Sequence, residues 1–464
     1  MFFVALKTFF DTFGAVIFVP VIIFIIALFL KVTPRKAFMS ALSAGVGLQG
    51  FSLLVGAYGG IITPVINRMV QDVGINLPIT DFGWQATSII AYSTEIGMIF
   101  IGVAILVQIV LFLTRYTNVF QAGDLWNNYS YMAWGSLLFI LHNNIWLSLS
   151  FMIFLLLVTL LTTEIVQKRW STYYQYPSCT IASLHTTTVS LLAIPINQFL
   201  DLLGLYKVKS DPETIRKKLG FIGEPMTLGL FLGLIIGIVG NFNRIGTLPA
   251  WGEIAVCAIG TAAVMAVFPK ISGIFAGSFG ALTEASKKSI KGTKGEWYLA
   301  VNDATGYGEP ATLITGILLM PLSLAIAFIL PGNETLPMLD LLAIPYIIQP
   351  VIAVSNGNIL KSVITGLVCM ALHLYFCTMT GETFTAVAAL RGVDLQGAAM
   401  ITSFCILGQP VPAAFFLIFN TLNPVLIGAS VAAYAVGYVL VRKNKPAIHE
   451  WLEKVAAKNA GAAA

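Results

Sequence analysis

The chain has 464 residues, of which 57% are hydrophobic and only 10% are charged, and its formal net charge is +5. A soluble domain carries about 25% charged residues, so this composition excludes an ordinary soluble protein and is typical of an integral membrane protein. The small positive charge is therefore not a sign of nucleic-acid binding. The five cysteines form neither CxxC nor CxxH spacings, so we expect buried thiols, with no disulfide framework and no metal site.

Eleven apolar runs are long enough, or nearly so, to cross a hydrocarbon core of about 30 Å, which predicts an all-α membrane protein of about eleven transmembrane helices. In chain order the runs lie near 12–30, 38–66, 88–113, 129–142, 145–165, 225–241, 250–269, 311–330, 339–354, 359–378 and 410–440. Two semi-apolar stretches rich in Ser, Thr, Gly and Ala, 178–203 and 380–408, are expected to be re-entrant hairpins. The first run lacks a basic flank and a small-residue cleavage site, so we expect it to be a retained helix.

Basic residues predict the orientation of these helices. In the eleven-helix arrangement nearly all of the 26 Lys and Arg residues fall on one side. The exceptions are Lys7, Arg68, Arg244 and Arg391. Positive residues stay in the cytoplasm, so the N-terminus is expected outside and the C-terminus inside. Basic clusters at 207–218 and 287–294 then face the cytoplasm, where they either contact anionic lipid or dock an acidic partner protein.

Polar landmarks recur in the same order in the two halves of the chain. Asp81 and Asp303 each precede a long apolar run, and each run leads to a polar loop and then to a helix closed by asparagines. Five crossings separate the copies, so their orientations are opposite, as in the inverted repeats of many transporters. The expected organisation is a first repeat of five helices and a hairpin (1–204), a basic linker (205–224), a second repeat of six helices and a hairpin (225–440) and a cytoplasmic tail (441–464).

An ionisable residue inside an apolar segment is costly, which makes His185 a functional candidate. It lies in the stretch Ser183–Thr188 of the first hairpin, where four hydroxyl side chains accompany the imidazole. These groups suit a polyol, which requires many neutral donors and acceptors. The alternative is a histidine that bonds to the backbone at a turn.

Asp303 is the second candidate, and it lies in a segment with two glycines and a proline before an apolar run. Such a broken helix start is tolerated in a membrane where it lines a cavity or is buried in protein. A carboxylate can accept sugar hydroxyls and can also act as a base toward one of them. The equivalent residue in the first half is Asp81, followed by Trp84, which could stack on a carbon chain. The alternative for either aspartate is a helix N-cap.

Gly-Glu-Pro triplets open two of the expected helices, at 223–225 and 308–310. Glu beside a Pro in the first turn is good capping chemistry, so we interpret Glu224 as structural and leave Glu309 open between a cap and a ligand. Through the repeat, further ligand candidates are Asp124, Asn128, Asn356 and Asn358. The sequence has no GxxxxGK[ST] motif, arginine ladder or TVGYG filter, which argues against direct ATP coupling and against a selective ion channel.

Several passages together carry a family resemblance. They are VPVIIFIIALFLKVTPRKAF, TDFGW, LTRYTNVFQAGDLWN, RKKLGFIGEPMTLGLFLGLIIGI, PGNETLPMLDLLAI and NGNILKSVITG. Over nearly its whole length the chain resembles the galactitol-type enzyme IIC (EIIC), the membrane permease of the bacterial phosphoenolpyruvate-dependent phosphotransferase system. It is more distantly similar to the ascorbate EIIC family.

The resemblance implies a homodimeric elevator transporter of the bacterial inner membrane, with a fixed scaffold and a moving core. It also implies that the imported alditol is phosphorylated by a separate EIIB carrying phosphocysteine, itself supplied through EIIA, so that the chain needs no cofactor beyond this phosphoenolpyruvate-derived phosphoryl group. The implied ligand groups are His185 and Thr186, Asp303, Asp81 and Phe82, and the segment from Asp124 to Asn128. Where relatives carry a His-Thr pair, this chain has Glu309-Pro310, so arabitol or another alditol remains an alternative to galactitol.

The resulting hypothesis gives Asp303 or His185 the task of orienting the substrate hydroxyl and taking its proton. Phosphoryl transfer from EIIB then traps the product inside the cell. The rival hypothesis is a secondary transporter of a sugar or polyol in which a carboxylate carries a coupled proton. Inverted repeats and buried carboxylates fit that class equally well.

Overall fold

The computed structural model describes residues 31–73, 77–92, 94–121, 125–219, 224–289, 296–393, 395 and 398–460, with scattered positions between 12 and 28. The helices are α2 (Pro34–Val73), α3 (Gly83–Tyr92), α4 (Glu95–Leu113), α5 (Leu125–His142), α6 (Ile145–Tyr174), α7 (Leu184–Thr187), α8 (Ser190–Leu202), α9 (Pro212–Leu219), α10 (Pro225–Val239), α11 (Leu248–Ser289), α12 (Ala304–Tyr307), α13 (Pro310–Ile329), α14 (Ile344–Ile347), α15 (Gln349–Ser355), α16 (Ile359–Leu390), α17 (Pro410–Asn420) and α18 (Pro424–Ala460). Three 3₁₀ helices are η1 (Leu205–Lys207), η3 (Phe242–Arg244) and η4 (Leu339–Ala343). Six short strands are β1 (Ile79–Asp81), β2 (Val119–Gln121), β3 (Cys179–Ile181), β4 (Tyr298–Val301), β5 (Thr335–Leu336) and β6 (Met400–Thr402).

Most of the expected apolar runs form helices. Within the described residues, six helices are long and apolar enough to cross a membrane, and they belong to α4, α6, α11, α13, α16 and α18. Much of the first expected helix, 12–30, lies outside the described residues. The run 339–354 was expected as one helix, but it is broken into η4, α14 and α15. Pro345 and Pro350 explain the break, because proline has no N–H to continue a helical ladder.

Other predicted boundaries are wrong as well. The run 88–113, expected as one helix, is divided between α3, which ends at Tyr92, and α4, which begins at Glu95. The run 410–440 forms two helices, α17 and α18, joined by a turn in which Leu422 has a φ of 56° and after which Pro424 starts the new helix. The predicted start of the second hairpin, 380–408, is also wrong. Helix α16 continues to Leu390, and the chain forms β6 only after this helix has ended. The segments expected as hairpins therefore contain a strand followed by helices, β3 with α7 and α8 in one half and β6 with α17 in the other.

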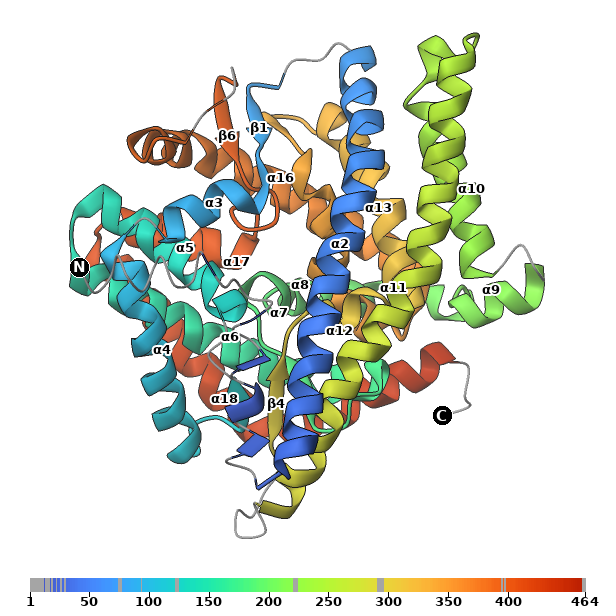
Figure 1. Ribbon diagram of the computed structural model, residues 1–464. Coiled ribbons are helices and arrows are strands. Elements are labelled where there is room, and N and C mark those ends of the chain that lie inside the picture. The colour runs from blue at the N-terminus through green and yellow to red at the C-terminus, as the bar shows by residue number, and fades with distance from the viewer. Residues whose placement is uncertain are drawn as a thin grey trace.

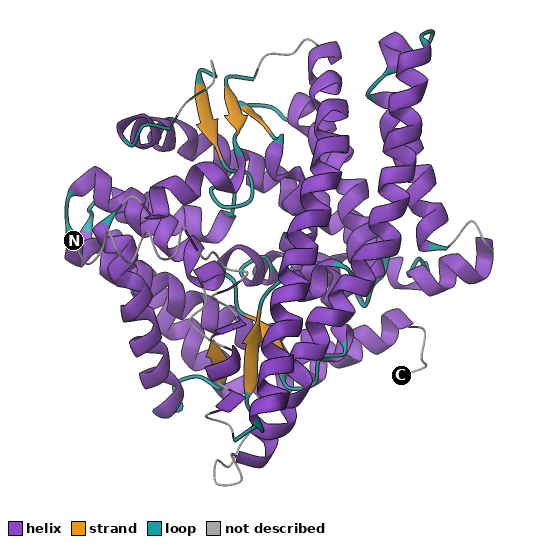
Figure 2. Ribbon diagram, viewed as in Figure 1, coloured by secondary structure: helices purple, strands orange, loops and turns teal. Residues whose placement is uncertain are grey.

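Two small parallel sheets tie the halves of the chain together. In one sheet β1 lies between β5 and β6, and in the other β4 lies between β2 and β3. Each central strand thus comes from one half, and both of its neighbours come from the other half. The strands of the two sheets point toward the middle of the molecule from opposite sides (Figure 2). The carboxyl ends of both sheets therefore meet near the centre, where the polar candidates of the sequence gather.

Helices α2, α10 and α11 form a separate layer along one side of these elements (Figure 1). Glycines allow α10 to approach α11 closely. A Cβ on Gly233 would lie 2.7 Å from the Cα of Ala258, and one on Gly229 would lie 2.9 Å from the Cα of Ala262. Small residues at such spacing are the usual means of close helix packing in membranes. The five cysteines are buried, as the sequence predicted.

Candidate functional site

His185 and Asp303 come together because β3 and β4 are parallel neighbours. Ile181 at the end of β3 pairs with Val301 at the end of β4, so the chain leaves both strands at the same edge. His185 follows in α7 and Asp303 at the start of α12. Nε2 of His185 lies 2.7 Å from Oδ2 of Asp303, and the hydroxyl of Thr186 donates to the same oxygen at 3.2 Å. The sheet thus joins two candidates that lie 118 residues apart in the sequence.

The second ring nitrogen of His185 also has a partner. Nδ1 lies 2.8 Å from the hydroxyl of Ser130, which belongs to α5. A neutral imidazole that donates from Nε2 to the Asp303 carboxylate accepts from the Ser130 hydroxyl at Nδ1, so both contacts are satisfied by one tautomer. The arrangement is a chain of hydroxyl, imidazole and carboxylate that can orient a substrate hydroxyl and accept its proton.

Two glutamines hold the backbone of this pair. Nε2 of Gln409 donates to the carbonyl oxygen of His185 at 2.6 Å, and Nε2 of Gln349 donates to the carbonyl oxygen of Asp303. Gln349 is itself oriented by the indole N–H of Trp170, which donates to its Oε1 at 3.2 Å. Sequence reasoning missed both glutamines. The available signal was a Gln-Pro pair at the start of two apolar helices of the second half, at 349–350 and 409–410.

The site is closed in this conformation. The exposed fraction is 2% for His185, 0% for Thr186 and 0% for Asp303. Burial removes competition from water, which strengthens every hydrogen bond to the carboxylate and penalises any that is lost. Any molecule could therefore reach these groups only after the surrounding elements had moved.

Asp81 lies at the end of β1, in the other sheet, and its carboxylate is occupied by the backbone. Oδ1 accepts from the N–H groups of Gly83 at 2.9 Å and Phe404 at 3.0 Å. Oδ2 accepts from those of Met338 at 3.0 Å and Asp340 at 2.8 Å. Four backbone donors from three segments make this side chain a junction of the fold.

Asp340 continues this junction. Its carboxylate accepts from the N–H of Trp84 at 2.9 Å, from the hydroxyl of Ser403 at 2.6 Å and from the N–H of Cys405 at 2.8 Å. The two aspartates thereby lock β1, β6 and η4 together. Phe82 and Trp84 of the predicted set are half-buried beside this junction.

The remaining candidates are dispersed. Asn128 is fully buried on α5, two residues before Ser130, and Asp124 lies outside the described residues. Glu309 caps α13, since its carboxylate accepts from the N–H groups of Ala311 and Thr312 at 3.0 and 2.8 Å. Of the two alternatives left open for Glu309, the structure shows the helix cap.

Glu309 also lines a polar recess of about 820 Å³ that is separate from the buried pair. In this recess it accepts a hydrogen bond from Tyr173 at 2.9 Å, and Asn356 accepts one from Arg169 at 3.0 Å. Arg169 also forms an ion pair with Glu453 of α18 at 2.6 Å. The recess thus lies where α6, α13, α15 and α18 meet.

Comparison with known proteins agrees with the resemblance seen in the sequence. Residues 8–398 match the family model EIIC-GAT, described as the PTS system sugar-specific permease component. The chain is 25% identical over 422 residues, which are 90% of this chain and 92% of the relative, to the galactitol-specific EIIC component of Escherichia coli strain K12. The same values hold for the galactitol-specific EIIC component of Escherichia coli O157:H7. With its apolar helices and a family match over most of its length, the chain belongs to the EIIC-GAT family and is a multi-pass inner-membrane permease component of a sugar phosphotransferase system.

Proposed function

We propose that the chain imports galactitol or a related alditol and presents it for phosphorylation by a separate EIIB. The observation that carries this proposal is the contact of His185 and Thr186 with Asp303, which gathers an imidazole, a hydroxyl and a carboxylate at one buried point. Such a set offers both donors and acceptors to the neutral hydroxyl groups of an alditol. The galactitol-specific relatives favour the same substrate class.

In the proposed reaction the phosphoryl group passes from the phosphocysteine of EIIB to one hydroxyl oxygen of the bound alditol. The S–P bond breaks and the O–P bond forms, while the cysteine thiolate stays on EIIB. The hydroxyl proton moves to the carboxylate of Asp303, which His185 orients by donating from Nε2 while its Nδ1 accepts from Ser130. The rest of the rate enhancement comes from holding the hydroxyl in line with the phosphorus.

We infer a division of labour among the candidates. Asp303, His185 and Thr186 contact the substrate, and Gln349 and Gln409 position them through backbone carbonyls. Because its carboxylate already accepts four backbone N–H groups, Asp81 stabilises the fold, and its counterpart Asp303 takes part in the reaction. Phe82, Trp84, Asn128 and Asn356 would shape the walls around a bound alditol or its path.

We propose in addition that the halves are inverted repeats. The correspondence of β1 with β4, β2 with β5 and β3 with β6 maps one sheet onto the other, strand order included, which supports the repeat. The layer of α2, α10 and α11 would be the scaffold of a homodimer, against which the elements carrying both sheets move as an elevator. The N-terminus lies outside and the C-terminus inside, where the basic segments 207–218 and 287–294 receive EIIB.

Calorimetric binding to the purified protein tests the substrate class. Binding of galactitol and arabitol is compared with binding of galactose, in the wild type and in His185→Gln. His142→Gln is the matched control, because His142 bonds to Asn420 and not to a member of the buried pair. We expect alditols to bind the wild type and the control alike, and His185→Gln to bind them about tenfold more weakly, since one hydrogen bond to the alditol is lost. Equal alditol affinity in all three proteins would refute the role of His185.

A further inference from the structure

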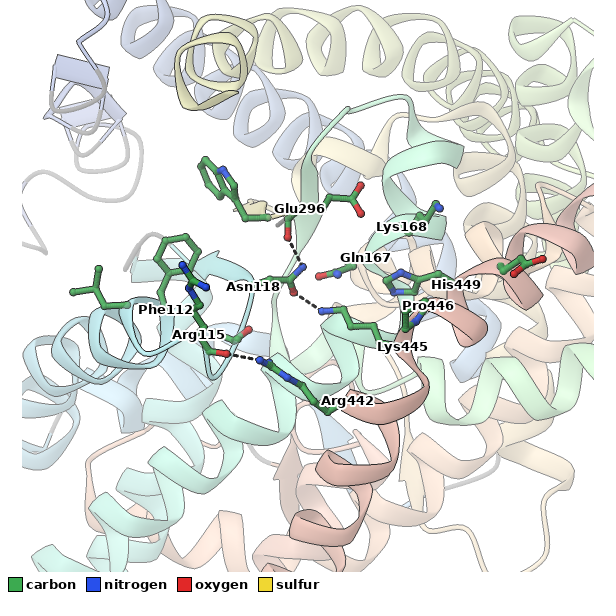
Figure 3. A pocket seen from close by; sticks show the side chains of 14 residues that line it. Phe112, Arg115, Asn118, Gln167, Lys168, Glu296, Arg442, Lys445, Pro446 and His449 are labelled. Carbon is green, nitrogen blue, oxygen red and sulfur yellow. Dashed lines mark hydrogen bonds between the residues drawn. The ribbon is translucent and has the colours of Figure 1, made fainter. Parts of the chain in front are cut away.

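A second recess, of about 680 Å³, lies between the carboxyl-terminal end of α4, the late turns of α6 and the middle of α18 (Figure 3). We call it the α4–α18 groove. Its wall also includes Glu296 and Trp297, directly before β4. None of the residues of the buried pair lines it, so the proposed transport chemistry leaves this groove unexplained.

The α4–α18 groove is rich in cations that lack acidic partners. Its basic lining residues are Arg115, Lys168, Arg442 and Lys445. Lys445 is neutralised by Glu164 at 2.7 Å, but among the described residues the other three form no ion pair. One of the two acidic lining residues, Glu450, is paired with Lys454 at 2.8 Å. The lining of the groove therefore carries a net positive charge.

Arg442 is held in position by the backbone of the neighbouring helix end. Its guanidinium donates to the carbonyl oxygens of Tyr116 at 2.8 Å and Arg115 at 2.6 Å, as Figure 3 shows for Arg115. One turn earlier on α18, the ring of Tyr438 stacks on that of Tyr116 with centroids 4.3 Å apart. A guanidinium fixed in this way loses little entropy when it binds an anion through its remaining N–H groups.

Part of the wall of the α4–α18 groove is apolar. Phe112, Leu113 and Trp297 line it, and 74% of Leu113 is exposed. Leu106 and Val110, which are 66% and 57% exposed, continue the face of Leu113 along α4 at helical spacing. An exposed apolar stripe on a membrane helix faces lipid chains, and a tryptophan beside cations at its end is typical of the headgroup level.

We propose that the α4–α18 groove binds an anionic phospholipid of the cytoplasmic leaflet. Arg115, Lys168 and Arg442 hold the phosphate of the headgroup, and an acyl chain lies on the stripe of α4. A soluble anion would bind the cations but would not contact the apolar wall. A lipid contacts both, so the presence of cations beside an apolar wall favours a lipid. The inference rests on the proposed membrane orientation and is independent of the sugar site. A bound lipid would contact α4, α6 and α18 at the same time.

Native mass spectrometry of the detergent-purified protein provides the test. Binding of phosphatidylglycerol and of phosphatidylcholine is measured for the wild type, for Lys168→Gln with Arg442→Gln, and for a control that also loses two charges, Lys36→Gln with Lys443→Gln. The control residues are exposed and lie outside the α4–α18 groove. Arg442→Lys keeps the charge, and comparing it with the double groove variant distinguishes a loss of lipid binding from a folding defect.

We expect the wild type to prefer phosphatidylglycerol and the control to bind it as the wild type does. The double groove variant should bind it about 30-fold more weakly, because each cation near the membrane surface contributes about 1 kcal/mol of binding free energy. Arg442→Lys should fall between the two, because it keeps the charge but not both carbonyl contacts. Equal lipid binding in the groove variant and the control would overturn the proposal. Inorganic phosphate that displaces the lipid at equal concentration would replace it with a soluble-anion site. Loss of EIIB binding with unchanged lipid binding would replace it with a protein-docking face.

Discussion

Replacing Asp303 by Asn removes one charge from the buried pair and leaves its volume unchanged. In the structure Oδ2 of Asp303 accepts hydrogen bonds from His185 and Thr186. A hydrogen bond to a charged group contributes about 1.5–3 kcal/mol, and an asparagine carbonyl retains part of each bond. We therefore expect the free energy of unfolding to fall by about 1–3 kcal/mol, which leaves the protein folded in the membrane.

Phosphorylation should suffer far more than stability in this variant. A general base contributes about 10²–10⁴-fold to a rate, so the transfer of phosphoryl groups to galactitol should slow by that factor. The assay uses sealed vesicles containing the variant, with the phosphotransferase proteins, EIIA and EIIB on the inside, and it scores labelled sugar phosphate per folded protein. A wild-type rate for Asp303→Asn would refute the assignment of this carboxylate as the base.

Asp81→Asn is the matched comparison, because it makes the same chemical change at the corresponding place in the other sheet. There the carboxylate accepts four backbone N–H groups, and an amide turns its own N–H₂ toward two of them. Loss of two such bonds should lower the free energy of unfolding by about 3–6 kcal/mol, while the rate per folded molecule is retained. Thermal unfolding followed with the same phosphorylation assay distinguishes the two aspartates, and a stable but inactive Asp81→Asn would reverse their assigned roles.

Three further substitutions follow from the same contacts. Ser130→Ala removes the partner of the His185 imidazole and should slow phosphorylation by about tenfold, as measured in the vesicle assay, whereas an unchanged rate would contradict the orienting role. Gly306→Ala places a methyl group against Gln349 and should abolish phosphorylation in a protein that still inserts, since a Cβ there would overlap the amide that holds Asp303; normal activity would show that this packing is not required. Arg169→Gln leaves the partly buried Glu453 without its partner and should lower the thermal midpoint by several degrees, unless the ion pair contributes nothing to the attachment of α18.

The sequence predicted the membrane class and the positions of most helices, because the position and length of an apolar run can be read directly from the sequence. It failed at the turn between α17 and α18. There the apolar character continues through Leu422, and the break depends on a left-handed residue and on the N-terminal proline of the next helix. It failed in the same way at η4 and α15, where prolines divide a run that hydropathy alone presents as continuous.

The buried pair was predicted as two separate candidates. His185 and Asp303 stood out because a titratable group in an apolar segment is rare. Their contact could not be predicted, since it depends on the parallel pairing of two strands too short to give a periodic signal. The glutamines at 349 and 409 were overlooked because a neutral amide in an apolar run carries no charge to draw attention to it. Asp81 looked equivalent to Asp303 in sequence, and only the positions of four backbone N–H groups separate them.

The central claim is that this permease component delivers an alditol to phosphorylation by EIIB. The most direct measurement is the uptake of labelled galactitol into sealed vesicles that contain phosphoenolpyruvate, the general phosphotransferase proteins, EIIA and EIIB. The account predicts that the label accumulates as sugar phosphate, that accumulation requires EIIB, and that a protonophore has no effect. Recovery of the label as free galactitol, with or without EIIB and abolished by the protonophore, would contradict it.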